Sequence, residues 1–366
     1  MYDPYLDTAG WKRWRVIWLF SGCVMIAVIL IVGGLTRLNQ AGLSITEWEV
    51  ISGVVPPLNH AEWEDAFDTY KQFPEYQYVH HGMTLGEFKV IYWWEYSHRM
   101  LSRFLGMLFL VPFLIFIWYR VMPPDDALKL GGIALLGGVQ AFLGWYMVQS
   151  GLDDQPVVSH IRLGIHLTVA FLIFSLLWTM VLNRYYTRNI GYTGAVKNRY
   201  LRNHSYRTFL GITKRQWIYI FGLSAIMLLF IQVMVGGWTA GLKAGFVYPT
   251  FPKMGDYWIP PEIGRLSPWW YDMSNNLISV QFIHRIIALL VTIVILPPAV
   301  AGIRSEVRPL QRAGLALLLI IALQIITGAL NVLWGVPVWL SSVHQGGALL
   351  LLAVLLLWRY HYKTAM

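Results

Sequence analysis

Long apolar stretches dominate the chain, and they predict helices that cross a membrane. Such a helix needs about 20 apolar residues to span the hydrocarbon core of a bilayer. A final stretch, residues 313–358, is too long for one helix and is interrupted by Trp334-Gly335-Val336-Pro337, which predicts two helices. The other stretches without Asp, Glu, Lys or Arg are 16–36, 104–119, 130–152, 163–183, 216–242 and 286–303. Two of these, 104–119 and 286–303, are short, and each is extended at its start by a segment containing a histidine and an arginine. The pattern predicts eight transmembrane helices.

Composition supports this prediction and excludes a water-soluble globular protein. Of the 366 residues 57% are hydrophobic and only 13% are charged, which is too little charge to cover a soluble surface. We therefore expect an all-α integral membrane protein in contact with membrane lipid. The net charge of +9 lies in short segments between apolar stretches, a pattern typical of membrane topology signals, so we expect no nucleic-acid partner.

The charged segments predict the orientation of the chain. Residues 184–215 contain eight Lys and Arg side chains and no Asp or Glu. Residues 37–95 are the opposite, with nine carboxylates against three basic residues. Basic loops stay on the cytoplasmic side. Eight helices then place both termini in the cytoplasm, and we expect a multi-pass protein of the cell inner membrane.

The two halves of the chain repeat the same motifs. Because four helices are followed by four more, the halves have the same topology and form a parallel repeat. We expect two pseudo-symmetric four-helix bundles, residues 1–183 and 216–366, joined by a basic linker, residues 184–215. The repeated motifs are Gly33-Gly34-x-Thr36 and Gly236-Gly237-x-Thr239, Gln140-x-x-x-Gly144 and Gln324-x-x-x-Gly328, and His98-Arg99 and His284-Arg285.

Four histidines lie within predicted helices at similar depth. An ionisable side chain within a membrane is costly and is by default a functional candidate. Two neutral imidazoles from facing helices can clamp the iron of a haem in a bundle core. The alternative is a hydrogen-bonding contact between helices. The four histidines are His98 and His166 in the first half and His284 and His344 in the second.

The arginine that follows a histidine in each half has two interpretations. Arg99 and Arg285 are candidate partners for haem propionates, because guanidinium matches carboxylate geometry. Anchoring at the lipid interface explains them equally well.

Glu95 distinguishes the two halves. It precedes His98 by three residues and therefore lies on the same helix face, whereas the corresponding residue before His284 is Gln281. A carboxylate beside one site equips that site for proton transfer, which an amide cannot provide. The alternative is a carboxylate at a helix start, stabilised by the helix dipole.

Other candidate groups carry no assigned chemistry. His60, His80 and His81 lie in the acidic segment without a second metal-ligand motif, and their function stays open. Cys23 is the single cysteine and lies in an apolar stretch, so the chain itself contains no cysteine pair.

The sequence resembles the haem A synthases, particularly their proteobacterial and mitochondrial branch, over nearly the whole chain. The matching strings, besides the glycine motifs above, include Gln72-Phe73-Pro74-Glu75, Glu95-Tyr96-Ser97-His98-Arg99-Met100, Phe251-Pro252-Lys253-Met254-Gly255 and His344-Gln345. The other branch of that family has a cysteine pair in an outer loop, so a mechanism using such a pair is excluded here.

The resemblance implies an oxidoreductase that converts a methyl group of haem O to the formyl group of haem A, for cytochrome oxidase assembly. It implies that His284 and His344 hold a haem B cofactor, that His98 and His166 flank the substrate haem, and that Glu95 is the important carboxylate. Haem O synthase and the oxidase assembly machinery are the implied partners. The electron donor and the oligomeric state are not implied.

Two other functions stay open on the residues alone. A membrane cytochrome b with two haems would transfer electrons without other chemistry. A transporter would also use parallel repeats, although histidines near one end of the helices count against it. In an enzyme that oxidises haem, an iron held by two histidines has no open position for oxygen. Either a substrate-side histidine leaves the iron, or oxidation starts by removing an electron from the porphyrin.

Overall fold

A computed structural model describes residues 9–47, 52–152, 156–189, 208–209 and 212–365. It contains eight helices that are long and apolar enough to cross a membrane, which confirms the predicted number. They are α1 (Ala9–Leu38), α4 (Leu85–Trp118), α5 (Pro124–Gln149), α6 (His160–Asn189), α8 (Lys214–Gly241), α10 (Leu277–Ile303), α11 (Arg308–Leu333) and α12 (Val338–Ala365). The chain is a multi-pass, all-α membrane protein.

Shorter elements lie between these helices. They are α2 (His60–Lys71), α3 (Pro74–Tyr78), α9 (Trp269–Asn275) and the single 3-10 turns η1 (Ser52–Val54) and η2 (Ala244–Phe246). The strands β1 (Thr208–Phe209) and β2 (Ile212–Thr213) pair antiparallel within the predicted linker. The rest of that linker, residues 190–207 and 210–211, lies outside the described residues.

The predicted interruption near residue 335 is confirmed. Helix α11 ends at Leu333 and α12 begins at Val338. Gly335 and Val336 have φ angles of 69° and 56°, a left-handed conformation that an α-helix cannot contain. Pro337 follows directly and cannot continue the preceding helix.

Helix α4 is longer than the apolar pattern predicts. It begins at Leu85 with a capping box, in which Thr84 and Glu87 satisfy each other's backbone N–H groups. This strong start signal precedes the apolar stretch by many residues. Glu95 and His98 therefore lie in the interior of a 34-residue helix.

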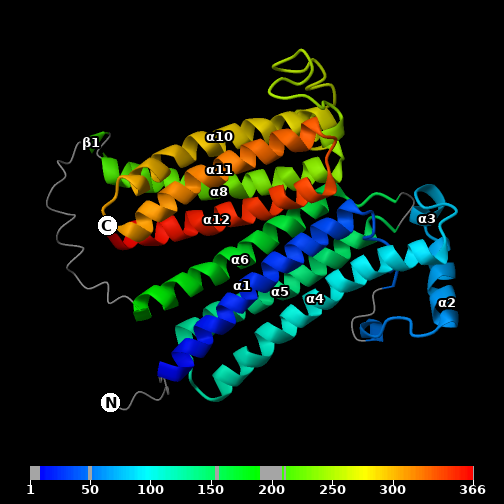
Figure 1. The fold of residues 1–366 in the computed structure, drawn as a ribbon, viewed down its shortest axis with the longest axis horizontal. Coiled ribbons are helices and arrows are strands. Elements are labelled where there is room, and N and C mark those ends of the chain that lie inside the picture. Colours follow the sequence, from blue (N-terminus) through cyan, green and yellow to red (C-terminus); the bar gives the residue numbers. More distant parts are fainter. Residues whose placement is uncertain (1–8, 48–51, 153–155, 190–207, 210–211, 366) are drawn as a thin grey trace. The chain divides into compact units, whose positions relative to one another are not determined.

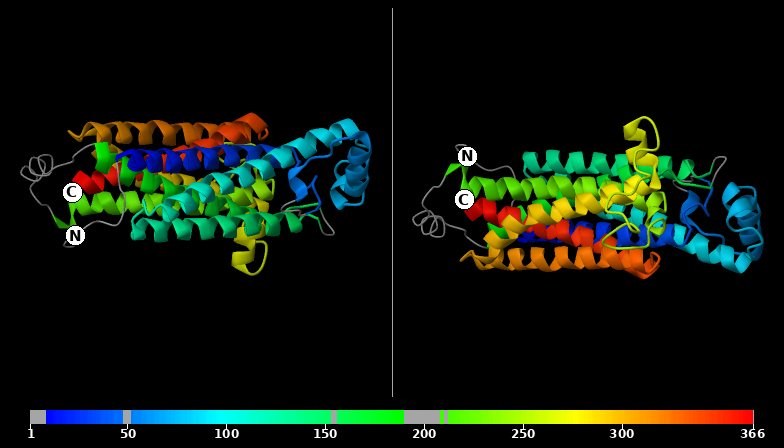
Figure 2. Two further views of the ribbon diagram at one scale, coloured as in Figure 1. Left: turned by 90° about the horizontal axis from the view of Figure 1, so that it is seen from below. Right: turned by 90° about the horizontal axis from the view of Figure 1, so that it is seen from above.

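The described chain forms two compact units. One contains Val24–Ala170, and the other contains Phe171–Met366 together with Thr8–Cys23. In the second unit α8, α10, α11 and α12 run side by side (Figures 1 and 2). These units divide within α1 and α6, so the division at residues 184–215 that follows the sequence repeat stays a prediction.

The acidic segment of the first unit has its own hydrophobic core. Helices α2 and α3 pack beside the first turns of α4 (Figures 1 and 2). The Phe67 and Phe88 rings stack with centroids 5.0 Å apart, and the Tyr70 and Phe88 rings lie 5.1 Å apart. These rings lie in a cluster of buried residues that we call the aromatic cluster. It consists of Ala41, Trp63, Phe67, Tyr70, Phe88, Ile91 and Tyr92.

In the second unit a buried carboxylate organises the segment before α10. Asp272 accepts hydrogen bonds from the backbone N–H groups of Gly264 and Leu266, at 2.9 and 3.0 Å, and from the side chains of Asn276 and Ser279. Burial raises its pKa, but the four hydrogen bonds outweigh burial and lower it to about 2. The ionised side chain therefore fixes this segment against the start of α10.

Candidate functional site

Each of the four predicted histidines packs against a glycine of a neighbouring helix. His98 of α4 faces Gly33 of α1, and His284 of α10 faces the repeat-related Gly236 of α8. The same holds for His166 of α6 with Gly144 of α5, and for His344 of α12 with Gly328 of α11. The repeated motifs therefore mark repeated contacts.

At these positions the imidazoles lie close to the neighbouring backbone, and at Gly33 they leave no space for a side chain. A Cβ atom at Gly33 would lie 2.7 Å from Cε1 of His98. At Gly236 the corresponding distance to His284 would be 3.2 Å, and at Gly144 and Gly328 it would be 3.1 Å to their histidines. An alanine at Gly33 would force the imidazole to move.

The histidines come together in the predicted pairs. His98 lies near His166 in the first unit, and His284 lies near His344 in the second. The Nδ1 atoms of His98, His166 and His284 are buried and have no hydrogen-bond partner in the described part of the chain. A buried nitrogen without a partner is costly and is explained when a metal or ligand completes it. The donor set therefore fits a haem iron held by two imidazoles.

Three of the four imidazoles also contact a polar side chain of a neighbouring helix. Nε2 of Gln140 lies 3.3 Å from Nε2 of His166, and Nε2 of Gln232 lies 3.3 Å from Nε2 of His284. Oγ1 of Thr327 lies 3.0 Å from Nδ1 of His344. Gln140 belongs to a motif that the sequence shows, whereas Gln232 and Thr327 have no repeat partner and were not predicted.

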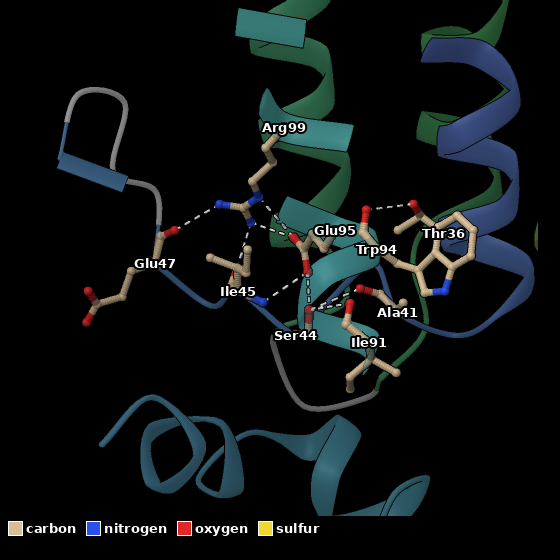
Figure 3. A network of polar contacts seen from close by, with 9 residues as sticks. All are labelled: Thr36, Ala41, Ser44, Ile45, Glu47, Ile91, Trp94, Glu95 and Arg99. Atoms are coloured by element: carbon tan, nitrogen blue, oxygen red, sulfur yellow. Dashed lines mark hydrogen bonds and ion pairs between the residues drawn. The ribbon is translucent and has the colours of Figure 1, made fainter. Parts of the chain in front are cut away.

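Glu95 is buried at the centre of a polar network (Figure 3). Its Oε2 accepts hydrogen bonds from the Ser44 hydroxyl at 2.8 Å and from the Ile45 N–H at 2.9 Å. Its Oε1 accepts two from the Arg99 guanidinium, at 3.0 and 2.6 Å. Arg99 also donates to the backbone carbonyls of Ile45 and Glu47. The network joins α4 to the segment after α1.

The second half contains a similar arrangement in which an amide replaces the carboxylate. Nε2 of Gln281 and Nη2 of Arg285 both donate to the carbonyl of Tyr248, each at 3.2 Å. Arg285 also donates to the carbonyls of Pro252 and Lys253. Both arginines therefore bind backbone carbonyls of the segment after the first helix of their half, and their binding of propionates stays a prediction.

The helix-start interpretation of Glu95 is wrong. The residue lies almost three turns into α4, beyond the reach of the helix dipole at Leu85. Sequence alone suggested a start near this position because the apolar stretch begins later. No hydrogen bond joins Glu95 to His98 among the described residues, so its effect on that site would act through space or through a further group.

The other histidines take part in local contacts. His60 forms an exposed ion pair with Glu64, and Nδ1 of His80 lies 2.7 Å from the Tyr70 hydroxyl. The His81 ring lies 6.0 Å from that of Tyr76. Within the described residues no group of three or more metal-binding side chains occurs. A function of His60, His80 or His81 in metal binding gains no support.

We expect the aromatic cluster to lose stability as pH rises. Burial, opposed by the Tyr70 hydrogen bond and reinforced by the charge of Glu95, raises the pKa of Glu75 from 4.5 to about 8. A carboxyl that is protonated in the fold contributes stability below pH 4.5, and this is lost as pH rises to about 8. Amide protection factors in α2 should fall over this range and stay constant in Glu75→Gln. Equal behaviour of both proteins would contradict the assignment.

The geometry defines a multi-pass membrane protein with two repeated pairs of intramembrane histidines. Residues 16–356 match the family described as cytochrome oxidase assembly protein. The chain is 42% identical over 349 residues to the heme A synthase of Nitrosospira multiformis, covering 94% of this chain and 92% of that protein. It is 36% identical over 345 residues to the heme A synthase of Parvibaculum lavamentivorans, covering 94% and 92%. For the heme A synthase of Rickettsia felis the values are 35% over 350 residues, covering 95% and 98%.

The chain belongs to this family of cytochrome oxidase assembly proteins, and within it to the haem A synthases.

Proposed function

We propose that the protein oxidises a methyl group of haem O to a formyl group and so supplies haem A to cytochrome oxidase. The similarity to haem A synthases extends over nearly the whole chain, which supports an oxidoreductase of this kind. The single structural observation that carries the proposal is the repeated pair of imidazoles, each fitted to a glycine. Two such sites in one protein would serve a substrate haem and a cofactor haem.

The two sites have different roles in this proposal. His284 and His344 hold a haem B cofactor, which supplies electron transfer when bound. His98 and His166 flank the substrate haem. The asymmetry at Glu95 and Gln281 supports this order, because oxidation of a methyl group releases protons and electron transfer alone does not.

Glu95 is the residue proposed to handle those protons. Four donors already fill the acceptor sites of its carboxylate, with two of them, from Arg99, on Oε1. Uptake of a proton at Oε2 therefore requires the hydrogen bond from Ser44 or from Ile45 to give way. A glutamine at this position would keep the shape of the side chain but could not change its protonation near neutral pH.

A cytochrome that only transfers electrons is the second candidate, and the similarity of the two histidine pairs favours it. It predicts two equivalents of haem B and no chemistry on either. For the transporter interpretation the helices offer no support, since each of the eight described spans is a continuous helix.

The experiment that tests the proposal is expression in cells that make haem O but lack their own haem A synthase. Extracted haems should then include haem A. Cells that express the His98→Leu variant at an equal level serve as the control. Absence of haem A in cells where the unaltered protein is inserted and carries haem would contradict the proposal.

We further propose that the protein resides in the cell inner membrane with both termini in the cytoplasm, where it receives haem O from haem O synthase. Conversion of the methyl to the formyl group removes four electrons, so an oxidant such as dioxygen has to accept them together with the electrons that a donor supplies. The charge difference between residues 37–95 and 184–215 supports this orientation.

A reporter fusion tests that orientation. A reporter that works only in the cytoplasm should be active near residue 200 and inactive near residue 65. A reporter that works only outside the cytoplasm should show the reverse. The two positions act as controls for each other because the same pair of reporters is used at both. Two reporters on the same side of the membrane would contradict the orientation.

Replacing Gly33 by alanine should impair the substrate site alone. The added Cβ would overlap His98, so the imidazole must shift, and we expect haem A formation to fall about 10-fold or more, as for a misplaced metal ligand. The haem B spectrum should be unchanged, because the glycine that packs against His284 is Gly236 and not Gly33. Gly106→Ala, in α4 with no atom within 4 Å of its added Cβ, is the matched control. Full activity of Gly33→Ala would contradict the placement of His98.

A further inference from the structure

The two halves differ in how their imidazoles are held. In the second half both are held by polar side chains. Gln232 lies near the His284 ring and also donates to the His284 carbonyl at 3.1 Å, and Thr327 contacts Nδ1 of His344. These partners come from α8 and α11, so each imidazole is tied to the neighbouring helix.

In the first half only one imidazole is held in this way. Gln140 contacts the His166 ring and donates to the His166 carbonyl at 3.1 Å. The His98 ring makes no hydrogen bond in the described part of the chain, and its Nδ1 is buried. The His98 ring therefore packs against Gly33 without a side-chain hydrogen bond to orient it.

The sequence repeat explains the difference. Gln232 lies four residues before Gly236, and the residue four before Gly33 is Ile29, which cannot form a hydrogen bond through its side chain. Thr327 directly precedes Gly328, whereas the residue directly before Gly144 is Leu143. In the first half, apolar residues thus stand where the second half has side-chain partners for imidazole.

Such partners matter for a ligand histidine. When one ring nitrogen binds a metal, the other carries the proton, and a hydrogen-bond acceptor fixes the tautomer and the orientation of the ring. The Thr327 hydroxyl can act as this acceptor. The Gln232 amide lies 3.3 Å from Nε2 of His284 and is itself held by its donation to the His284 carbonyl, so it restrains the ring.

We propose that Gln232 and Thr327 are positioning residues that make the second histidine pair a permanent haem holder, and that Ile29 leaves His98 as the readily exchanged ligand of the first pair. A cofactor haem has to stay bound through many turnovers, whereas a substrate haem has to enter and its product has to leave. The inference rests on the proposed function, since it takes His284 and His344 as haem B ligands.

The first test measures how firmly haem B is held in the purified full-length protein. Haem B transfer to excess apomyoglobin should be about 10-fold or more faster in Gln232→Leu and in Thr327→Val, with a shifted midpoint potential. Thr327→Ser should restore both values, because it keeps the hydroxyl. Thr292→Val is the matched control, since its hydroxyl donates only to the Ala288 carbonyl of its own helix.

The second test adds the missing partner to the first half. Ile29→Gln should slow the transfer of the copurified substrate or product haem about 10-fold, whereas Ile29→Leu should leave it unchanged. Parent-like transfer rates and potentials in both Gln232→Leu and Thr327→Val would overturn the inference, and so would unchanged transfer in Ile29→Gln.

The His284→Leu variant separates the inference from the proposed function. If it loses haem B while Gln232→Leu and Thr327→Val hold haem B as firmly as the parent, the inference alone fails. If His284→Leu keeps the haem B spectrum, the ligand assignment fails, and the inference fails with it.

Discussion

Replacing His284 by leucine is expected to abolish the low-spin haem B spectrum of the purified protein. The substitution removes a proposed axial ligand, and leucine offers no atom that can take its place. His344→Leu should have the same effect, because His344 is the second proposed ligand of the same haem. Optical spectra of protein purified in detergent provide the measurement.

The control for this experiment is a variant that changes the same helix without touching the site. Thr292→Val should keep the full spectrum, because its hydroxyl binds only the backbone of α10. A normal spectrum in both His284→Leu and His344→Leu would show that haem B is held elsewhere, with the first pair as the next candidate.

Replacing Glu95 by glutamine is expected to lower haem A formation about 100-fold or more, in line with the contribution of a general acid or base. Haem B should stay bound, because its proposed ligands lie in the other half. Accumulation of a partly oxidised alcohol would also agree with this role, because the later oxidation step releases protons too. Chromatography of extracted haems measures both products.

The structure offers a competing explanation that this experiment has to exclude. Glu95 also forms an ion pair with Arg99 and ties Ser44 and Ile45 to α4, so glutamine could act by loosening that segment. Ser44→Ala removes one hydrogen bond and keeps the carboxylate, and we expect it to lower activity less than 10-fold. Equal losses in Ser44→Ala and Glu95→Gln would assign a structural role to Glu95, and full activity of Glu95→Gln would refute the proton-handling role.

The sequence predicted the membrane helices well because lipid imposes a simple rule on them. A spanning helix must be apolar over its whole length, so its presence is visible without tertiary information. Helix ends were less predictable. Helix α4 starts at Leu85 because Thr84 and Glu87 cap it, and its first turns pack on the aromatic cluster. A polar segment with its own core carries no long apolar signal.

The sequence identified the four candidate histidines but not the side chains that contact them. Four histidines in a repeat stand out because ionisable side chains are rare in membranes. Gln232 and Thr327 do not stand out, because polar uncharged residues are tolerated in such helices for many reasons. The contact between Gly33 and His98 was likewise hidden, since a glycine motif does not reveal which side chain packs on it.

The most direct test of the central claim is the identity of the haems that copurify with the full-length protein from cells that make haem O. The proposed function predicts haem B together with haem O or haem A, with haem B lost in His284→Leu and the other haem retained. Two equivalents of haem B and no haem O or haem A would contradict it and would identify the protein as an electron carrier.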